Sequence, residues 1–185
     1  MPIKNGEYLI IKGEGYVDIP EITKETKIYK SKLKFNLDTV NIGNSEMQHL
    51  DFAYASSLIR TFMNDESLVL TIRGRKYTPK FKFKAGEHRH EIEVNGVQTE
   101  VDAGYEGRDK VVGIGAKNNR AKNEIIRQIY YPFRQWQYKT KKIVIPMFFE
   151  KEVDMYLIWQ FEFQDIEDYS SIKLVKSGKF RIIEN

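Results

Sequence analysis

The stretch VQTEVDAGYEGRDKVVGIGAKNN, residues 97–119, decides both the fold and the candidate site. Two β-rich segments, 97–104 and 110–117, are separated by turn-forming residues, which predicts two strands joined by a turn. Acidic residues end the first segment and a lysine ends the second. This layout suits a site that holds a divalent metal ion against a phosphate. We therefore expect the chemistry of this protein where these two strands end.

Strand alternation places Glu100 and Asp102 on one face. Two such carboxylates repel each other unless a cation lies between them or they splay into water, and Mg²⁺ is the natural partner of oxygen ligands. If the two strands are adjacent, Lys117 lies near Asp102, where it orients a water or stabilises transition-state charge. The pattern predicts Asp102 and Glu100 as Mg²⁺ ligands, although acidic and basic residues also end many ordinary hairpins.

Length and composition indicate one globular domain. The chain has 185 residues, of which 30% are charged, 41% hydrophobic and 13% aromatic. No apolar run reaches the roughly 18 residues of a membrane span, and no signal-peptide pattern is visible, so we expect a cytoplasmic protein without membrane partners. The absence of cysteine excludes disulfides and thiolate sites. A net charge of +4 is compatible with a polyanionic partner.

Hydrophobic periodicity predicts two helices among many strands. Apolar residues recur at helical spacing over 44–63, where Ser45 and Gln48 predict a capping box and Glu46 lies in the first turn. A second helix is predicted over 119–138, with a kink, break or end where Pro132 interrupts it.

Short β-rich segments fill the rest of the chain. Segments 67–75, 80–85, 90–94, 97–104 and 110–117 follow one another, which predicts a meander, and two strongly apolar strands are expected over 141–150 and 154–163. Residues 171–183 predict a closing hairpin around Ser177 and Gly178. The order of helix, strands, helix and strands predicts a mixed α/β domain with a central sheet.

A basic strand face offers a second candidate surface. Lys80 and Lys82 fall on one side of the predicted strand over 80–85. Such a face contacts phosphates, or it is a solvated face whose lysines discourage edge-to-edge pairing.

Several segments in the same order resemble a group of type II restriction endonucleases with the PD-(D/E)xK nuclease fold. The resemblance covers residues 43–136, and its segments EVDAGYE and RQIYYPFR are fairly specific. It implies an α/β (α+β) fold with a central mixed sheet flanked by helices. The implied organisation is one nuclease-fold domain over 1–185, with N-terminal strands and turns over 1–42, a catalytic core over 43–140 and C-terminal strands over 141–185.

The resemblance also implies roles for individual residues. Asp102 becomes the central metal ligand and Lys117 the catalytic lysine, while Glu46 becomes an acidic residue aimed at the metal or its water. Glu46 is also explained by the helix dipole alone.

The resemblance and the distribution of basic residues together predict which residues contact DNA. Arg127 and Gln128 are implied to support the site or to touch DNA, although Arg127 and Arg134 are also explained as solvated helix residues. The full set of expected DNA-binding residues is Arg73, Arg75, Arg127, Gln128, Arg134, Lys80 and Lys82.

Gly115 departs from the family pattern, in which the second strand reads Glu-Ala-Lys-Asn and the glutamate binds metal. Here Gly115 is followed by Ala116, Lys117 and Asn118. Three explanations stay open: an inactivating change in an enzyme that would harm its host, an active variant in which Glu100 or Glu46 supplies the missing oxygen, and an inactive nuclease fold kept for DNA binding.

The resemblance therefore implies a Mg²⁺-dependent, sequence-specific endonuclease for double-stranded DNA. We expect a homodimer, since two copies cut both strands of a palindromic site, and a cognate DNA methyltransferase in the same system. The alternative is a DNA-binding protein that does not cleave. A domain that uses its sheet only for protein contacts is the third class.

Overall fold

A computed structural model describes residues 1–41, 43–117 and 123–184. In chain order the elements are β1 (Pro2–Lys4), β2 (Glu7–Tyr8), β3 (Tyr16–Asp18), β4 (Lys27–Lys30), the 3-10 helix η1 (Asp38–Asn41), α1 (Glu46–Ala55), α2 (Leu58–Met63), β5 (Val69–Tyr77), β6 (Phe81–Ala85), β7 (His90–Val94), β8 (Gln98–Glu106), β9 (Lys110–Lys117), β10 (Asn123–Ile125), α3 (Ile126–Lys139), β11 (Ile143–Glu152), β12 (Met155–Phe163) and β13 (Ile172–Ile183).

The main sheet has seven strands in the order β4-β13-β12-β11-β9-β8-β5. β11 runs parallel to β9, and β13 runs parallel to β4, whereas the other neighbours are antiparallel. Three smaller sheets pair β1 with β2, β3 with β10, and β6 with β7. The expected mixed α+β fold with a large mixed sheet is confirmed.

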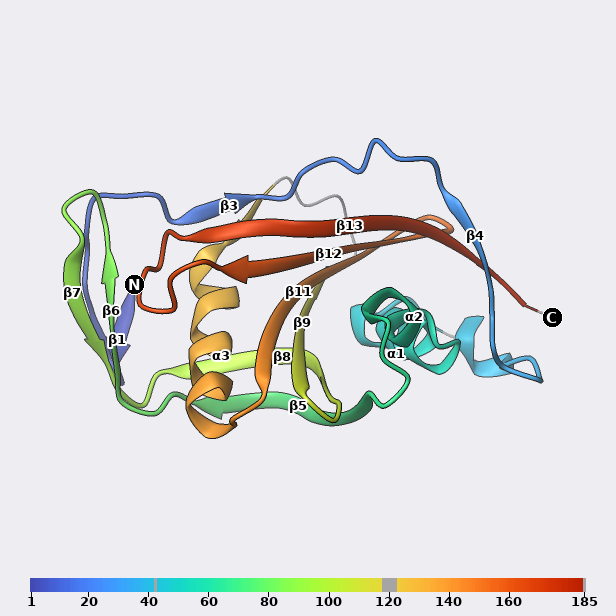
Figure 1. Cartoon of the computed structure of the whole chain (residues 1–185), viewed down its shortest axis with the longest axis horizontal. Helices are drawn as coiled ribbons and strands as arrows, with labels where there is room; N and C mark the ends of the chain where they lie inside the picture. The colour runs from blue at the N-terminus through green and yellow to red at the C-terminus, as the bar shows by residue number, and fades with distance from the viewer. Residues whose placement is uncertain (42, 118–122, 185) are drawn as a thin grey trace.

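Helices flank the sheet on both faces. α1 and α2 lie on one side of β9 and β11, and α3 lies on the other (Figure 1). Adjacent residues of β9 explain this layering, because Val112 and Ile114 join the apolar cluster that includes α1, whereas Val111 joins the cluster that includes α3. β9 is therefore covered on both faces, as its apolar sequence requires.

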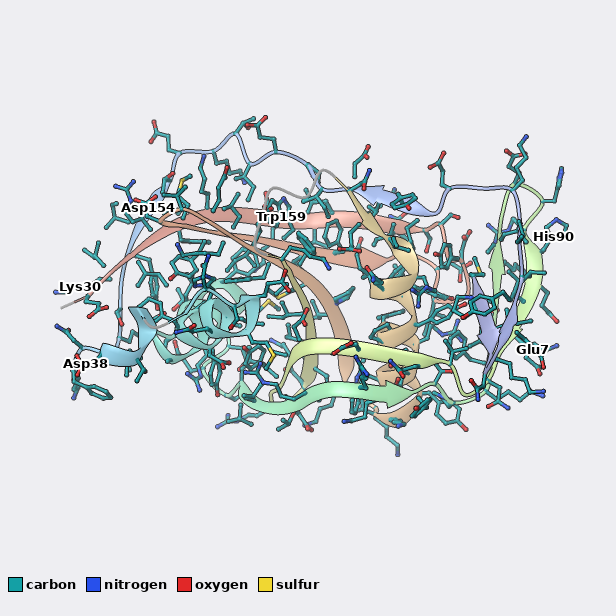
Figure 2. The ribbon with its side chains drawn as sticks, turned by 180° about the vertical axis from the view of Figure 1, so that it is seen from behind. Glu7, Lys30, Asp38, His90, Asp154 and Trp159 are labelled. Carbon is teal, nitrogen blue, oxygen red and sulfur yellow. The ribbon has the colours of Figure 1, made fainter. Side chains whose placement is uncertain are left out.

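The molecule is elongated, and its two ends are built differently. The β6–β7 hairpin and β1 lie at one end, and α1, α2 and β4 lie at the other (Figure 1). Figure 2 shows Glu7 and His90 at the first end and Lys30 and Asp38 at the second. Trp159 lies between these ends and is 2% exposed, and its indole N–H donates to the Pro20 carbonyl at 2.8 Å.

The first predicted helix is two helices. Ser45 caps α1 as expected, because its hydroxyl accepts the Gln48 N–H at 3.2 Å. The helix ends after Ala55, and Ser57 adopts a left-handed conformation with φ of 68° before α2 begins. Periodicity continues across this break, since Leu50 and Leu58 are both fully buried. The prediction of one continuous helix over 44–63 is therefore wrong.

The predicted meander is also wrong in one respect. Its five strands exist close to their predicted bounds, but β5 pairs directly with β8, and β6 and β7 form a separate hairpin between them in sequence. The β6–β7 hairpin therefore projects from the main sheet.

The predicted closing hairpin at Ser177 and Gly178 is a single strand. Both residues lie within β13 and pair with β12, Ser177 with Trp159 and Gly178 with Ile158. A Cβ at Gly178 would lie 2.6 Å from a ring carbon of Phe180, so the glycine makes room for this ring instead of forming a turn.

The second helix begins later than predicted and continues past its proline. α3 starts at Ile126, after β10, and contains Pro132 in its interior. The predicted start at residue 119 lies outside the described residues. No helix in the described part of the chain is long and apolar enough to cross a membrane.

Candidate active site

A cleft of about 290 Å³ lies between α3 and the strands β8, β9 and β11. Its polar lining comes from both sides of the cleft and includes Gln98, Thr99, Glu100, Asp102, Lys117, Glu124, Arg127 and Gln128. Gly115 lines it as well. The fold thus brings the predicted Asp102, Glu100, Gly115 and Lys117 to one cleft, together with two of the predicted DNA-binding residues.

Asp102 lies where β8 and β9 separate. The β8–β9 pairing ends with Ala103 opposite Ile114. Asp102, the preceding residue of β8, contacts β9 through its side chain. Its Oδ2 accepts the Ala116 N–H at 2.7 Å. The carboxylate is therefore fixed by the backbone of the strand that carries Gly115 and Lys117.

A register irregularity in β8 changes the predicted alternation. Ile72 pairs with Gly104 and Gly74 with Val101, so the single residue Arg73 lies opposite two residues of β8. Val101 and Ala103 accordingly join apolar clusters on opposite faces of the sheet. Strict alternation fails between them because a β-bulge places an extra residue in one strand.

Arg73 links this irregular segment of β8 to helix α1. Its Nη1 donates to the Asp102 carbonyl at 2.8 Å, and its Nη2 forms an ion pair with Asp51 of α1. The side chain is 28% exposed. These contacts orient the backbone of Asp102 and give Arg73 a structural task beside its predicted DNA contact.

Glu100 has its own basic neighbour. Its carboxylate lies 3.5 Å from Nε of Arg75, and both side chains are more than half exposed. An exposed pair of this kind is weak. Glu100 and Arg75 therefore stay available to other partners.

Gly115 leaves an open position at the centre of the site. A Cβ built on it would meet nothing within 4 Å, and its backbone conformation is one that other residues adopt. The glycine is exposed and lines the cleft between Asp102 and Lys117. A side chain there would enter the cleft without a clash.

Lys117 ends β9 and is exposed. Among the residues that the structure describes, its ammonium has no hydrogen bond or ion pair. A phosphate or water in the cleft is therefore not in competition with a carboxylate for this charge. The neighbouring Asn118 of the family pattern lies outside the described residues.

α3 supplies the opposite wall. Arg127 and Gln128 lie in its first turn, and Gln128 is exposed at the cleft. The Arg127 guanidinium lies 6.0 Å from the centre of the Tyr131 ring. Cationic and amide groups thus face the carboxylate-bearing strands.

Glu124 was missed by sequence reasoning. It is 8% exposed, lines the cleft, and accepts the Ile125 N–H at 2.8 Å. We predicted a helix over 119–138, which made Glu124 an ordinary helix residue. The observed strand β10 buries it instead.

The remaining predicted residues lie elsewhere. Glu46 begins α1 and is not among the described residues that line the cleft. Arg134 donates to the Ile166 carbonyl at 2.6 Å and lies over the Phe81 ring, away from the cleft.

The two hairpin lysines are paired with acidic residues. Lys80 lies 2.9 Å from Glu93, and Lys82 lies 2.7 Å from Glu91 on the facing strand. They share one exposed face, as predicted, because the alternate residues of β6 are buried. The glutamates neutralise much of its positive charge.

The carboxylates present suit a hydrated Mg²⁺ ion. Within residues 1–41, 43–117 and 123–184, no group of three or more His, Cys, Asp or Glu side chains is arranged to hold a metal. Mg²⁺ keeps several water ligands and is commonly held by one or two carboxylates together with substrate phosphates. Asp102, fixed by a backbone N–H, meets this lower requirement, with Glu100 as a second oxygen donor at the cleft.

Comparison with known proteins gives one result. Residues 11–181 match the family described as Domain of unknown function (DUF6997). The chain belongs to this family. The DUF6997 match includes every residue of the cleft. Neither the curated proteins nor the solved structures gave a match.

Proposed function

We propose that this protein is a Mg²⁺-dependent, sequence-specific endonuclease for double-stranded DNA, of the type II restriction class and the PD-(D/E)xK fold, in an inactive form. The observation that supports this proposal is the convergence of Asp102, Gly115 and Lys117 in one cleft opposite Arg127 and Gln128. A carboxylate, a lysine and an empty intervening position reproduce the family pattern with its glutamate removed.

The chain's own residues have distinct tasks in this chemistry. Bound Mg²⁺ would supply Lewis-acid stabilisation of the phosphate and an activated water. Asp102 would hold the ion, since its carboxylate is already oriented by the Ala116 N–H. Lys117 would orient the attacking water and stabilise negative charge as the phosphate oxygen bond breaks. Arg127 and Gln128 would hold the DNA backbone across the cleft.

The inactive form is favoured among the three explanations of Gly115. Glu46 is not among the described residues that line the cleft, and within the described part of the chain Asp102 and Glu100 have no third His, Asp or Glu side chain placed to complete a metal-holding group. A position that accepts a side chain without contact within 4 Å is consistent with the loss of a glutamate. We infer that the site lacks one oxygen ligand and retains the rest.

A DNA-binding protein without cleavage is the second candidate. Lys117, whose ammonium has no partner among the described residues, and Arg127 on α3 favour it, because a phosphate can bind to both charges whether or not metal binds. Both candidates place double-stranded DNA in the cleft.

Assembly and context extend the proposal. A homodimer would place two clefts on the two strands of a palindromic site. A cognate methyltransferase would protect host DNA without remaining bound, and the system would act in the cytoplasm.

The test compares this chain with Gly115→Glu. Each protein is incubated with unmodified plasmid and genomic DNA in Mg²⁺, and discrete fragments are read on a gel. We expect fragments from Gly115→Glu alone. Asp102→Asn in the Gly115→Glu background should abolish them, and Lys117→Ala should slow cleavage by about 100-fold or more.

The outcomes separate the candidates. Cleavage by the unsubstituted chain would overturn the inactive form and direct attention to Glu100. If neither protein cuts while both bind duplex DNA, the DNA-binding candidate replaces the enzyme. If neither binds DNA, both candidates fail.

A further inference from the structure

The inner part of the cleft is hollow because two residues of β9 lack side chains. Gly113 and Gly115 lie two residues apart on the same face of this strand. A Cβ on Gly113 would have only Val101 Cγ1 near it, at 4.0 Å, and one on Gly115 would meet nothing within 4 Å. Neither glycine has a left-handed conformation. The backbone at Gly113 does not require glycine, so this residue provides open space, and close approach of a ligand is one of the reasons for a glycine within a strand.

Aromatic and apolar side chains enclose this space. Phe133 and Trp136 of α3 line one side, and Pro146 and Phe148 of β11 line the other. The volume of about 290 Å³ lies at the small end of ligand pockets, which suits a single ring with its sugar.

Two buried donors of α3 lack acceptors, and one of them, on Trp136, belongs to a residue that lines the cleft. The Trp136 indole N–H and the Gln135 Nε2 have no hydrogen-bond partner among the described residues. Gln135 is fully buried, and its Oε1 accepts the hydroxyl of Thr99, which lines the cleft, at 2.6 Å. An unsatisfied buried donor is costly, so the indole N–H of Trp136, a residue that lines the cleft, favours a ligand with acceptor atoms.

The mouth of the cleft is charged where its interior is apolar. Lys117 and Arg127 line the same cleft and suit a phosphate, whereas the glycine floor and Trp136 suit a flat ring. A nucleotide combines a phosphate with a flat ring that carries acceptor atoms.

We propose that the inner cleft is a nucleobase pocket that receives one unstacked base of the bound DNA. This inference rests on the proposed DNA-binding function. The base lies over Gly113 beside Trp136, and its phosphate lies at Lys117 and Arg127. Enzymes that bind an extruded base hold it between aromatic and apolar side chains in this manner.

The experiment measures affinity for three fluorescein-labelled duplexes by anisotropy in EDTA, which prevents cleavage. One duplex is perfectly paired, one carries a single unpaired thymidine, and one carries an abasic nucleotide at that position. We expect at least about tenfold tighter binding of the thymidine bulge than of either other duplex, because the unpaired base is already free to enter the pocket.

Substitutions at Gly113 provide the matched comparison. Gly113→Leu fills the pocket and should reduce the preference for the thymidine bulge below about twofold, because the unpaired base can no longer enter while the phosphate contacts, which the three duplexes share, remain. Gly113→Ala leaves most of the space and should keep the preference. Circular dichroism and melting confirm that both variants fold.

Any one of the following results would overturn the proposed nucleobase pocket. Equal binding of the thymidine and abasic bulges would overturn the pocket, because the protein then recognises a bend. Normal duplex binding without any preference, or a preference kept by Gly113→Leu, would overturn it as well. If the protein binds none of the three duplexes, the proposed function fails together with the pocket.

Discussion

Gly104 and Gly113 face each other in the β8–β9 ladder, yet the structure predicts opposite effects of adding one methyl group to each. A Cβ on Gly104 would lie 2.6 Å from the Cβ of Ile72, an atom next to the backbone of β5. Backbone movement is needed to relieve this contact, and overpacking of this kind costs about 1–3 kcal/mol. Gly104→Ala should therefore lower the melting temperature by about 2–12 °C in a chain of this size.

Gly113→Ala should stabilise the folded protein instead. Its nearest neighbour would be Val101 Cγ1 at 4.0 Å, which is ordinary van der Waals contact. Alanine restricts the unfolded chain more than glycine does, which stabilises a compatible site by about 0.4–1 kcal/mol. The melting temperature should rise by about 1–4 °C.

Thermal unfolding followed by circular dichroism, with both variants and the unsubstituted chain in parallel, checks this pair. Equal destabilisation by the two substitutions would refute the reasoning, because Gly113 would then be packed. The cleft above β9 would not exist in solution.

Three further predictions concern other parts of the molecule. Arg73→Ala removes the hydrogen bond that Arg73 donates to the Asp102 carbonyl. The free energy of unfolding, measured in urea, should fall by about 1.5–3 kcal/mol, and nearer the lower value because the Arg73 side chain is partly exposed. Lys117→Ala should reduce the slope of log DNA affinity against log salt by about 0.9, whereas Lys82→Ala should leave it unchanged because its ammonium is paired across the hairpin. Burial raises the pKa of Tyr169 to about 12, above the usual value near 10. The stability it contributes is complete below pH 10 and is lost as the pH rises towards 12, so the urea midpoint should fall over that interval, and less in Tyr169→Phe.

The strands around the candidate site were predictable because local chemistry specifies them. The turn between residues 106 and 110 separates two β-rich segments, and β8 and β9 form there as an adjacent pair. The N-cap of α1 was also predictable, since Ser45 and Gln48 satisfy a short-range rule.

Features that depend on distant contacts were not predictable. Gly178 resembles a turn residue in sequence, but its neighbour is the Phe180 ring within a continuous strand. The bulge at Asp102 is set by pairing with β5, which no local pattern records. The break at Ser57 is hidden because apolar spacing continues across it.

The cleft itself was predictable only in part. Asp102, Gly115 and Lys117 follow from the strand pattern and from the resemblance. Gly113 and Glu124 became visible as site residues only when α3 was placed over β9.

Metal binding tests the central claim most directly. Mn²⁺, a spectroscopically and calorimetrically convenient substitute for Mg²⁺, is titrated into this chain, into Gly115→Glu, and into Gly115→Glu with Asp102→Asn. We predict that Gly115→Glu binds Mn²⁺ at least about tenfold more tightly than the unsubstituted chain, a difference of about 1.4 kcal/mol, and that Asp102→Asn removes this gain. Equal affinity of all three proteins would show that Asp102 and position 115 do not share a metal, which contradicts the nuclease site proposed for this cleft.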